Sequence, residues 1–234
     1  VGAFRDAASL THPLCDLYGV RYVVSRIAPA DVQMKAITES LARLRGPGLS
    51  AALACFAEAG AAAAIVDRTP ANTGAYHLLE RPTAMPRATF VRGVDIVTDP
   101  TARLTALASR DRDVRARMVL EDPNAPTPRP VDRADATVEI TLHDDERVEL
   151  LVQTSHDGYV RLADPHDAGW RVTVDGADAP IYVADHYLRA VYVKAGEHRL
   201  VFTYDGARVV WPLRLSLVAL LAVLAALWTG RRSR

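Results

Sequence analysis

Near the end of the chain stands Trp211-Pro-Leu-Arg-Leu-Ser-Leu-Val-Ala-Leu-Leu-Ala-Val-Leu-Ala-Ala-Leu-Trp228, an apolar segment bounded by two tryptophans. From Leu215 to Leu227 it contains only Leu, Val, Ala and one Ser. A helix over this segment would be about 27 Å long, which is close to the hydrocarbon thickness of a bilayer. Tryptophans suit the two membrane interfaces, and the arginines that follow suit a cytoplasmic edge. We therefore expect a transmembrane helix over residues 208–230 and a basic tail over residues 231–234.

Arg214 is the main objection to this interpretation, because an arginine at the bilayer centre costs about 2.5–3.5 kcal/mol on insertion. It lies close to Trp211 in sequence, however, so its guanidinium can reach the interface. The alternative is a buried amphipathic helix of a soluble domain. The lack of a polar face disfavours that alternative.

The composition limits the classes of partner. The formal net charge of the 234 residues is +0, which gives no indication of a nucleic-acid partner. The two cysteines, Cys15 and Cys55, could form one disulfide outside the cytoplasm or remain two buried thiols, and their spacing does not resemble a metal site. No Gly-rich phosphate loop, zinc-spaced Cys/His set or nucleophile elbow is present.

The first half of the chain alternates helical and strand patterns and predicts a small α/β domain over residues 1–122. Residues 17–25 are β-branched and aromatic, which is typical of a buried strand. Asp99 followed by Pro100 is typical of a helix N-terminus and predicts a helix over 100–109. The remaining expected elements are helices at 31–44 and 49–59 and strands at 62–67, 74–79, 89–94 and 114–120.

A proline-rich linker is expected over residues 123–134, since four prolines occur between Pro123 and Pro130. Beyond it the hydrophobic period becomes two, which predicts an antiparallel seven-strand β-sandwich over 135–207. The expected strands are 137–141, 148–153, 159–162, 170–174, 180–183, 188–193 and 198–204. The fold class is therefore α+β, mainly β, with one C-terminal transmembrane helix.

Two groups of motifs together resemble a known family. The first is Tyr76-His-Leu-Leu-Glu80-Arg-Pro-Thr-Ala-Met-Pro86-Arg87. The second comprises Gly169-Trp170-Arg-Val-Thr-Val-Asp175-Gly176, Leu188-Arg189-Ala-Val-Tyr-Val and Ala195-Gly196-Glu-His198. In this order, before a membrane span, they resemble the C-terminal extracytoplasmic region and last helix of bacterial YfhO-like membrane proteins, in the GT-C glycosyltransferase superfamily. Residues 17–24 resemble the entry strand of that region. Residues 164–168 depart from the family, which often has aromatic residues there, and residues 26–62 match nothing in it.

The resemblance implies a polytopic enzyme that transfers sugars from a polyprenyl-phosphate donor to cell-envelope polymers. Its catalytic acids would lie in an early outer loop that this chain does not contain, so we assign no catalytic residue, cofactor or metal, and we expect the chain alone to be non-catalytic. Because Val1 is not a starting Met, the chain is expected to be a fragment, a split gene or an alternative start. The implied partners are the bilayer, the missing N-terminal transmembrane region, and a cell-envelope glycan or lipid-linked sugar.

The topology depends on what precedes the chain. Upstream transmembrane helices would place the folded part outside the cell and the C-terminus in the cytoplasm, which is the arrangement that we expect for this bacterial membrane protein. A lone C-terminal anchor would instead leave the folded part in the cytoplasm.

Structural roles account for most of the family motifs. Trp170 supplies buried area, Asp175-Gly176 forms a tight turn, and Gly196 permits a positive φ. Arg189 is expected to pair with a carboxylate or backbone carbonyls, and Arg87 is expected to form a salt bridge or contact a phosphate. Direct contact of these motifs with sugar or lipid is the alternative.

One further pattern concerns His and Asp residues at alternate turns of the expected sandwich. If those turns share one end, their side chains could gather around a cation or sugar hydroxyls, and otherwise they are ordinary turn residues. The residues are His143, Asp144, Asp145, His166, Asp167, Asp185 and His186. His156-Asp157 is expected at the opposite end.

We expect the chain to be a membrane-anchored accessory region of a YfhO-like glycosyltransferase that positions an acceptor polymer or braces the membrane core. One alternative is a non-catalytic carbohydrate-binding module, which would display aromatic side chains on a face of the sandwich. The other is a structural or partner-docking membrane anchor, which would not.

Overall fold

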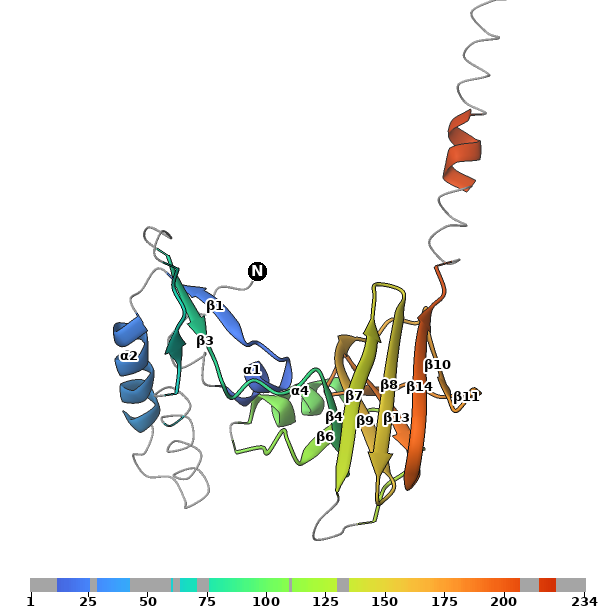
Figure 1. Ribbon diagram of the computed structural model, residues 1–234, viewed down its shortest axis with the longest axis horizontal. Helices are drawn as coiled ribbons and strands as arrows, with labels where there is room; N and C mark the ends of the chain where they lie inside the picture. The colour runs from blue at the N-terminus through green and yellow to red at the C-terminus, as the bar shows by residue number, and fades with distance from the viewer. Residues whose placement is uncertain are drawn as a thin grey trace, which may run out of the picture.

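The computed structural model is mainly β, with three sheets and few helices among the residues that it describes, which confirms the α+β, mainly β part of the expected fold class (Figure 1). It describes residues 12–25, 29–42, 60, 64–70, 76–109, 111–129, 135–206 and 215–221. The expected helix at 49–59 and Cys55 therefore lie outside the described residues.

A small antiparallel sheet lies beside helix α2 (Pro29–Ala42) (Figure 1). Its order is β1-β3-β2, with β1 at Tyr22–Ser25, β3 at His77–Glu80 and β2 at Val66–Asp67. Val32 of α2 packs with Ile65 and Leu79 in a small core. The expected helix at 31–44 is confirmed within the described residues.

The expectation of a buried strand over 17–25 is only partly right. The strand begins at Tyr22, because helix α1 (Pro13–Leu17) and the turn at Gly19, where φ is 64°, precede it. Tyr22 and Val24 are 53% and 67% exposed. The strand pairs on one side only, with β3, so it is an edge strand rather than a buried one.

The second sheet is antiparallel and has the order β11-β10-β14-β8-β7. Its strands are β7 (Ala136–His143), β8 (Arg147–Thr154), β10 (Trp170–Val174), β11 (Ala177–Ala179) and β14 (Gly196–Tyr204). Between β10 and β11, Asp175 and Gly176 have φ values of 53° and 85°, which is the backbone of a tight hairpin turn.

The third sheet has the order β4-β9-β13-β12-β6-β5. Its strands are β4 (Ala88–Val91), β5 (Gly93–Ile96), β6 (Arg117–Leu120), β9 (Gly158–Pro165), β12 (Tyr182–Ala184) and β13 (Leu188–Val193). Only Arg92 separates β4 from β5, although these strands form the two edges. The sheet must therefore curl so that its two edges come together at Arg92. The single strand expected at 89–94 is in fact these two strands.

Each face of the curled sheet lines a separate core. One core packs it against the five-stranded sheet and includes Val160, Val191, Leu150, Leu200 and Phe202. The other core lies on the opposite face and includes Tyr159, Met118, Leu120 and Leu188, with Leu17 of α1. Arg161 points to the second core, because it alternates with Val160 and Leu162 along β9.

The seven strands expected after residue 135 are all present in the described residues, with an eighth, β11, that the sequence did not indicate. They do not form a sandwich by themselves. Strands β4, β5 and β6 complete the curled sheet, and they precede the segment 123–134. That segment therefore connects strands of one shared sheet.

Helix α4 (Pro100–Ala108) begins after Asp99, whose side chain accepts a hydrogen bond from the Ala102 N–H, as the sequence predicted. The expected strand at 114–120 begins only at Arg117.

Residues 215–221 form a helical segment. The rest of the expected span 208–230 lies outside the described residues, together with Trp211, Arg214, Trp228 and the basic tail. Among the helices of the described part of the chain, none has both the length and the apolar character needed to cross a membrane.

Candidate functional site

A cavity of about 630 Å³ lies where the small sheet meets the curled sheet. It is lined by the segment that leads from β3 to β4 and by residues beside β1 and β2. Four arginines and one glutamate contribute to the lining: Arg21, Arg68, Arg81, Arg87 and Glu80. Glu80, Pro86 and Arg87 of the family motif therefore lie in one place, whereas Tyr76 is exposed outside the lining.

Strand pairing brings two arginines to Glu80. Glu80 is the last residue of β3 and lies opposite both Tyr22 and Val66, so Arg21 and Arg68 flank it. Its Oε1 accepts hydrogen bonds from Arg21 Nε at 2.9 Å and Nη2 at 2.8 Å, and its Oε2 accepts one from Arg68 Nε at 2.7 Å. These hydrogen bonds hold the pKa of Glu80 below its usual range, and the bond from Arg68 has the largest effect. The carboxylate is therefore ionised at neutral pH.

Arg81 is the buried arginine of the cavity lining. Its Nη1 donates to the Val20 carbonyl at 2.7 Å, and its Nη2 donates to Asp16 at 2.6 Å. Asp16 of α1 also accepts a hydrogen bond from the Thr83 hydroxyl, and its carbonyl accepts one from the Met85 N–H. This buried guanidinium thus holds the segment after β3 against α1.

Arg87 connects the cavity, through Asp164 of β9, to the curled sheet and the five-stranded sheet packed against it, which we call the sandwich. The buried Asp164 carboxylate accepts a hydrogen bond from Arg87 Nε at 2.7 Å and pairs with Arg189 at 3.0 Å. His143 contacts the same carboxylate at 3.4 Å. Arg87 therefore forms the salt bridge that the sequence suggested, and Arg189 pairs with a carboxylate as expected.

Arg189 lies between the two sheets, with its guanidinium 4.0 Å from the centre of the Trp170 ring. The centre of the Phe202 ring lies 5.4 Å from the same guanidinium. Burial lowers the pKa of Arg189 to about 10, so it remains charged at neutral pH. Among the described residues its Nε and Nη1 have no hydrogen-bond partner, and the cation–π contacts offset part of that cost.

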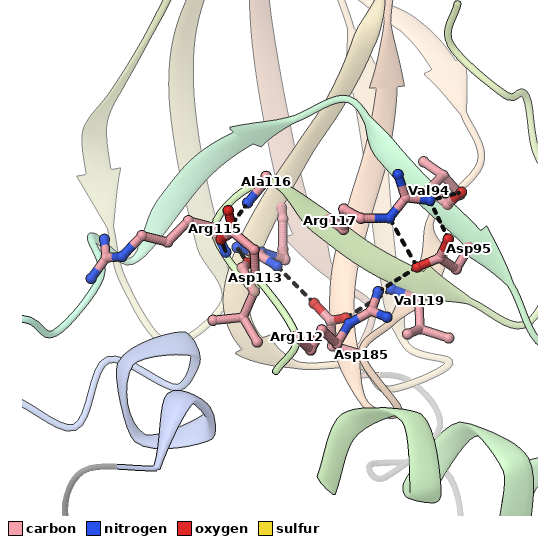
Figure 2. A network of polar contacts seen from close by, with 11 residues as sticks. Val94, Asp95, Arg112, Asp113, Arg115, Ala116, Arg117, Val119 and Asp185 are labelled. Atoms are coloured by element: carbon pink, nitrogen blue, oxygen red, sulfur yellow. Dashed lines mark hydrogen bonds and ion pairs between the residues drawn. The ribbon is translucent and has the colours of Figure 1, made fainter. Parts of the chain in front are cut away.

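A second buried ion pair lies in the other core, where Arg161 Nη1 donates to Asp185 at 2.9 Å. Asp185 also accepts a hydrogen bond from the Val119 N–H at 2.9 Å. Burial raises the pKa of Asp185 and lowers that of Arg161, and the opposite charge of each partner counteracts both shifts. Figure 2 shows this carboxylate beside Val119.

Near this pair, Arg112 and Arg117 both contact Asp95, the former at 2.9 Å (Figure 2). Asp113 accepts hydrogen bonds from the backbone N–H groups of Arg115 and Ala116, which forms the turn before β6. This network joins β5 to β6 and has a structural role.

The expected turn cluster is only partly assembled. The His166 N–H donates to the Tyr187 carbonyl, and His143 reaches Asp164, so the three turns do share one end. Asp185, however, points into the core. Within the described residues no group of three or more His, Cys, Asp or Glu side chains could hold a metal ion.

The other turn residues are used by the backbone or are exposed. Asp167 accepts a hydrogen bond from the Gly169 N–H, and the Asp144 N–H donates to the Arg147 carbonyl. His186, whose φ is 78°, is exposed at its turn. Asp157 lies at the opposite end, as expected, where it accepts the Ala195 N–H.

The remaining motif residues stabilise hairpins. Asp175 contacts His198 at 2.7 Å and accepts a hydrogen bond from the Arg199 N–H, so the turn after β10 is held against β14. Gly196 has a φ of 139°, as its position required. A Cβ on Gly169 would lie 2.7 Å from the Tyr204 ring, so any larger residue there would have to displace that ring.

The faces of the sandwich do not carry exposed aromatic side chains within the described residues. The exposed aromatic residues are Tyr22, Tyr76 and Tyr187, which lie in the small sheet, beside it and in a turn. A shallow depression of about 410 Å³ on β7, β8 and β14 is lined by side chains such as Leu151, Glu197 and Arg199. It therefore lacks the stacking platform that a carbohydrate-binding module needs.

Sequence reasoning missed Arg21, Arg68, Arg161 and Asp164. Arg161 did carry a signal, since it is the only charged residue in the apolar run Tyr159-Val-Arg-Leu162. No signal in the sequence pointed to Arg21 or Arg68, because only the register of the small sheet brings them to Glu80.

Comparison of the chain with family models, with curated proteins and with solved structures gives no significant match.

Proposed function

We propose that this chain is the membrane-anchored, extracytoplasmic accessory region of a YfhO-like glycosyltransferase that uses polyprenyl-phosphate sugars and acts on cell-envelope polymers. The last helix would span the bilayer over residues 208–230, with the C-terminus in the cytoplasm. The folded part would brace the membrane core or position the acceptor polymer. The sequence motifs support the family, and the exposed helical leucines support the anchor.

One observation carries the membrane part of the proposal. Leu215, Leu217, Val218, Leu220 and Leu221 are each at least 54% exposed. Covering a Leu or Val side chain fully is worth about 1.5–3 kcal/mol, so these five half-exposed side chains together would gain about 4–8 kcal/mol from an apolar cover. The sequence continues in the same apolar character to Leu227, so a bilayer is the cover that fits this length.

The position of this helix indicates which end of the sandwich would face the membrane. It follows β14, whose end lies beside the turn after β7, because the Tyr204 N–H donates to the Glu146 carbonyl. The Asp205 N–H donates to the Gly169 carbonyl in the turn after β9. These turns would therefore lie near the lipid surface, and the opposite end with Asp157 would point away.

The aromatic side chains support an accessory role over a carbohydrate-binding module. The Trp170 ring contacts the Arg189 guanidinium and the Tyr204 ring, and the centres of the two rings lie 5.3 Å apart. Tyr159 and Tyr192 pack edge to face in the interior. These rings are not available to stack on a sugar.

Flotation with phosphatidylcholine vesicles tests the anchor. The full chain should float with the vesicles, and a Leu217→Arg/Leu220→Arg variant should float far less, because each arginine adds about 2.5–3.5 kcal/mol to the insertion cost. Leu151→Arg is the matched control, since Leu151 is also about half exposed but lies on the sandwich. Equal flotation of the double variant and the native chain would contradict the anchor.

The glycosyltransferase part needs a test in the cell. Deletion of the gene should remove a sugar substituent from an envelope polymer, measured by sugar analysis and mass spectrometry of the isolated polymers. Complementation with the intact gene should restore it. An unchanged sugar profile would contradict the enzymatic part and leave the anchor unaffected.

A further inference from the structure

The arginine-lined cavity between the small sheet and the curled sheet has no role in the proposed function. Its lining contains four guanidinium groups and one carboxylate. Asp16 and Asp164 pair with Arg81 and Arg87 from outside the lining. Positive charge exceeds negative charge even when both of these carboxylates are counted.

Three of the four guanidinium groups remain accessible to a ligand. The side chains of Arg21, Arg68 and Arg87 are more than half exposed, whereas Arg81 is buried. Among the described residues, Arg68 uses only its Nε, on Glu80, so its two terminal nitrogens stay available. Arg21 and Arg87 each use Nε and Nη2 on a carboxylate, which leaves Nη1.

The carboxylates fix these groups in place rather than fill the cavity. Glu80 binds Arg21 and Arg68 from the β3 side, and Asp164 binds Arg87 from β9. A ligand would therefore meet guanidinium groups that are already oriented, which reduces the entropy lost on binding.

We propose that this cavity binds a phosphoryl group, as a phosphate monoester or diester. The three available guanidinium groups come from three separate segments, at residues 21, 68 and 87. A phosphoryl group presents oxygens in several directions and can accept from all three, whereas a carboxylate has two oxygens in one plane. The volume of about 630 Å³ also leaves room for the group that the phosphate esterifies.

Calorimetric titration with inorganic pyrophosphate tests the site, with the full chain reconstituted in phosphatidylcholine vesicles. Saturable binding is expected. Arg68→Gln should weaken it about tenfold or more, because a charge-assisted hydrogen bond to the phosphate is lost. Glu80→Gln should strengthen it, since the variant removes the negative charge in the lining. The Gln side chain keeps one oxygen for an arginine, so weaker binding by Glu80→Gln would contradict the net charge of the lining as the source of the affinity.

The matched control is Arg199→Gln. Arg199 is also a half-exposed arginine paired with a glutamate, Glu149, but it lies on the outer face of the sandwich. Its replacement should leave pyrophosphate affinity unchanged, and circular dichroism should show that all variants fold. Absence of binding, or equal weakening by Arg68→Gln and Arg199→Gln, would overturn the proposal.

A second arm separates a lipid headgroup from a soluble phosphate. Phosphatidylglycerol is added to the vesicles and the pyrophosphate titration is repeated. If the cavity takes a lipid headgroup, the phosphodiester should compete and lower the apparent pyrophosphate affinity of the native chain. Unchanged affinity assigns the site to a soluble phosphate. The first titration is also carried out on the full chain in non-ionic detergent, where pyrophosphate binding does not depend on insertion into vesicles, so the two proposals can be judged separately.

Discussion

Replacement of Arg161 by Met would remove the positive partner of a carboxylate that has almost no access to solvent. The Asp185 side chain is 1% exposed and receives Arg161 Nη1 at 2.9 Å. Loss of one member of a buried ion pair costs about 3–5 kcal/mol, because the remaining charge stays desolvated and unpaired. Native domains are stable by about 5–15 kcal/mol, so Arg161→Met should fold but unfold at a much lower urea concentration.

The double variant Arg161→Met/Asp185→Asn isolates the charge effect. Asparagine keeps an oxygen for the Val119 N–H and tolerates the φ of 48° at this position. The Val114 carbonyl still loses its bond from Arg161 Nη2, which costs about 1–2 kcal/mol. The double variant should therefore lose about 1–2 kcal/mol, less than Arg161→Met alone.

The pH dependence of Arg161→Met gives an independent check on the same reasoning. Burial already raises the pKa of Asp185, and loss of its cationic partner should raise it further. A carboxyl group whose pKa is raised in the folded state destabilises the fold increasingly as pH rises above its unfolded value of about 4. The stability deficit of Arg161→Met should therefore shrink as pH falls from about 7 to about 5.

Urea unfolding of the full chain in non-ionic detergent, followed by circular dichroism, measures these values. The native chain, Arg161→Met, Asp185→Asn and the double variant form a double-mutant cycle, in which the double variant should be about 2–3 kcal/mol more stable than Arg161→Met. A coupling energy near zero, or a loss below about 1 kcal/mol for Arg161→Met, would refute the buried pair as described.

Two further predictions concern other parts of the fold. Gly169→Ala should destabilise the chain by about 1–3 kcal/mol, because its Cβ would lie 2.7 Å from the Tyr204 ring. Gly206→Ala is the control in thermal unfolding, since nothing lies within 4 Å of its added Cβ, and an equal shift of both melting temperatures would contradict the steric explanation. Stability should also fall as pH drops below about 4, because arginine hydrogen bonds lower the pKa values of Glu80 and Glu149 and protonation removes that stabilisation. Acid titration by circular dichroism measures this loss, and a fold that keeps full stability at about pH 2 would contradict it.

The strands of the second half could be predicted because their side chains alternate between a core and a more exposed face. In β7 this alternation is complete, with Val138 and Ile140 turned toward the core and Glu139 exposed. The hairpin turns could be predicted for the same local reason, since Asp175-Gly176 forms the tight turn that was expected and has positive φ at both residues. Local pattern therefore determined most of the secondary structure.

The arrangement of the sheets could not be predicted, because it depends on contacts between distant segments. Nothing local indicates that Ala88 pairs with Leu162 while Gly93 pairs with Arg117. Gly93 carried only an ambiguous signal. A Cβ there would lie 2.5 Å from the Ala116 carbonyl oxygen, but a glycine near a turn has many explanations.

The candidate site was only partly predictable for the same reason. Arg87 and Glu80 were selected as motif residues, but their partners are remote in sequence, at Asp164 and Arg68. Asp185 does lie in the turn between β12 and β13, as the sequence predicted. Its carboxylate, however, is buried against Arg161 inside the fold, which the sequence did not indicate.

The sheet that is shared by strands before and after residues 123–134 has a consequence for how such a protein can evolve. Gene recombination within residues 123–134 would give two pieces, neither of which could pair all its strands. The later piece would lack β4 beside β9 and β6 beside β12. Bare strand edges of this kind promote aggregation. We therefore expect the two halves to be inherited together and to diverge as one unit, although a proline-rich segment separates them in the sequence.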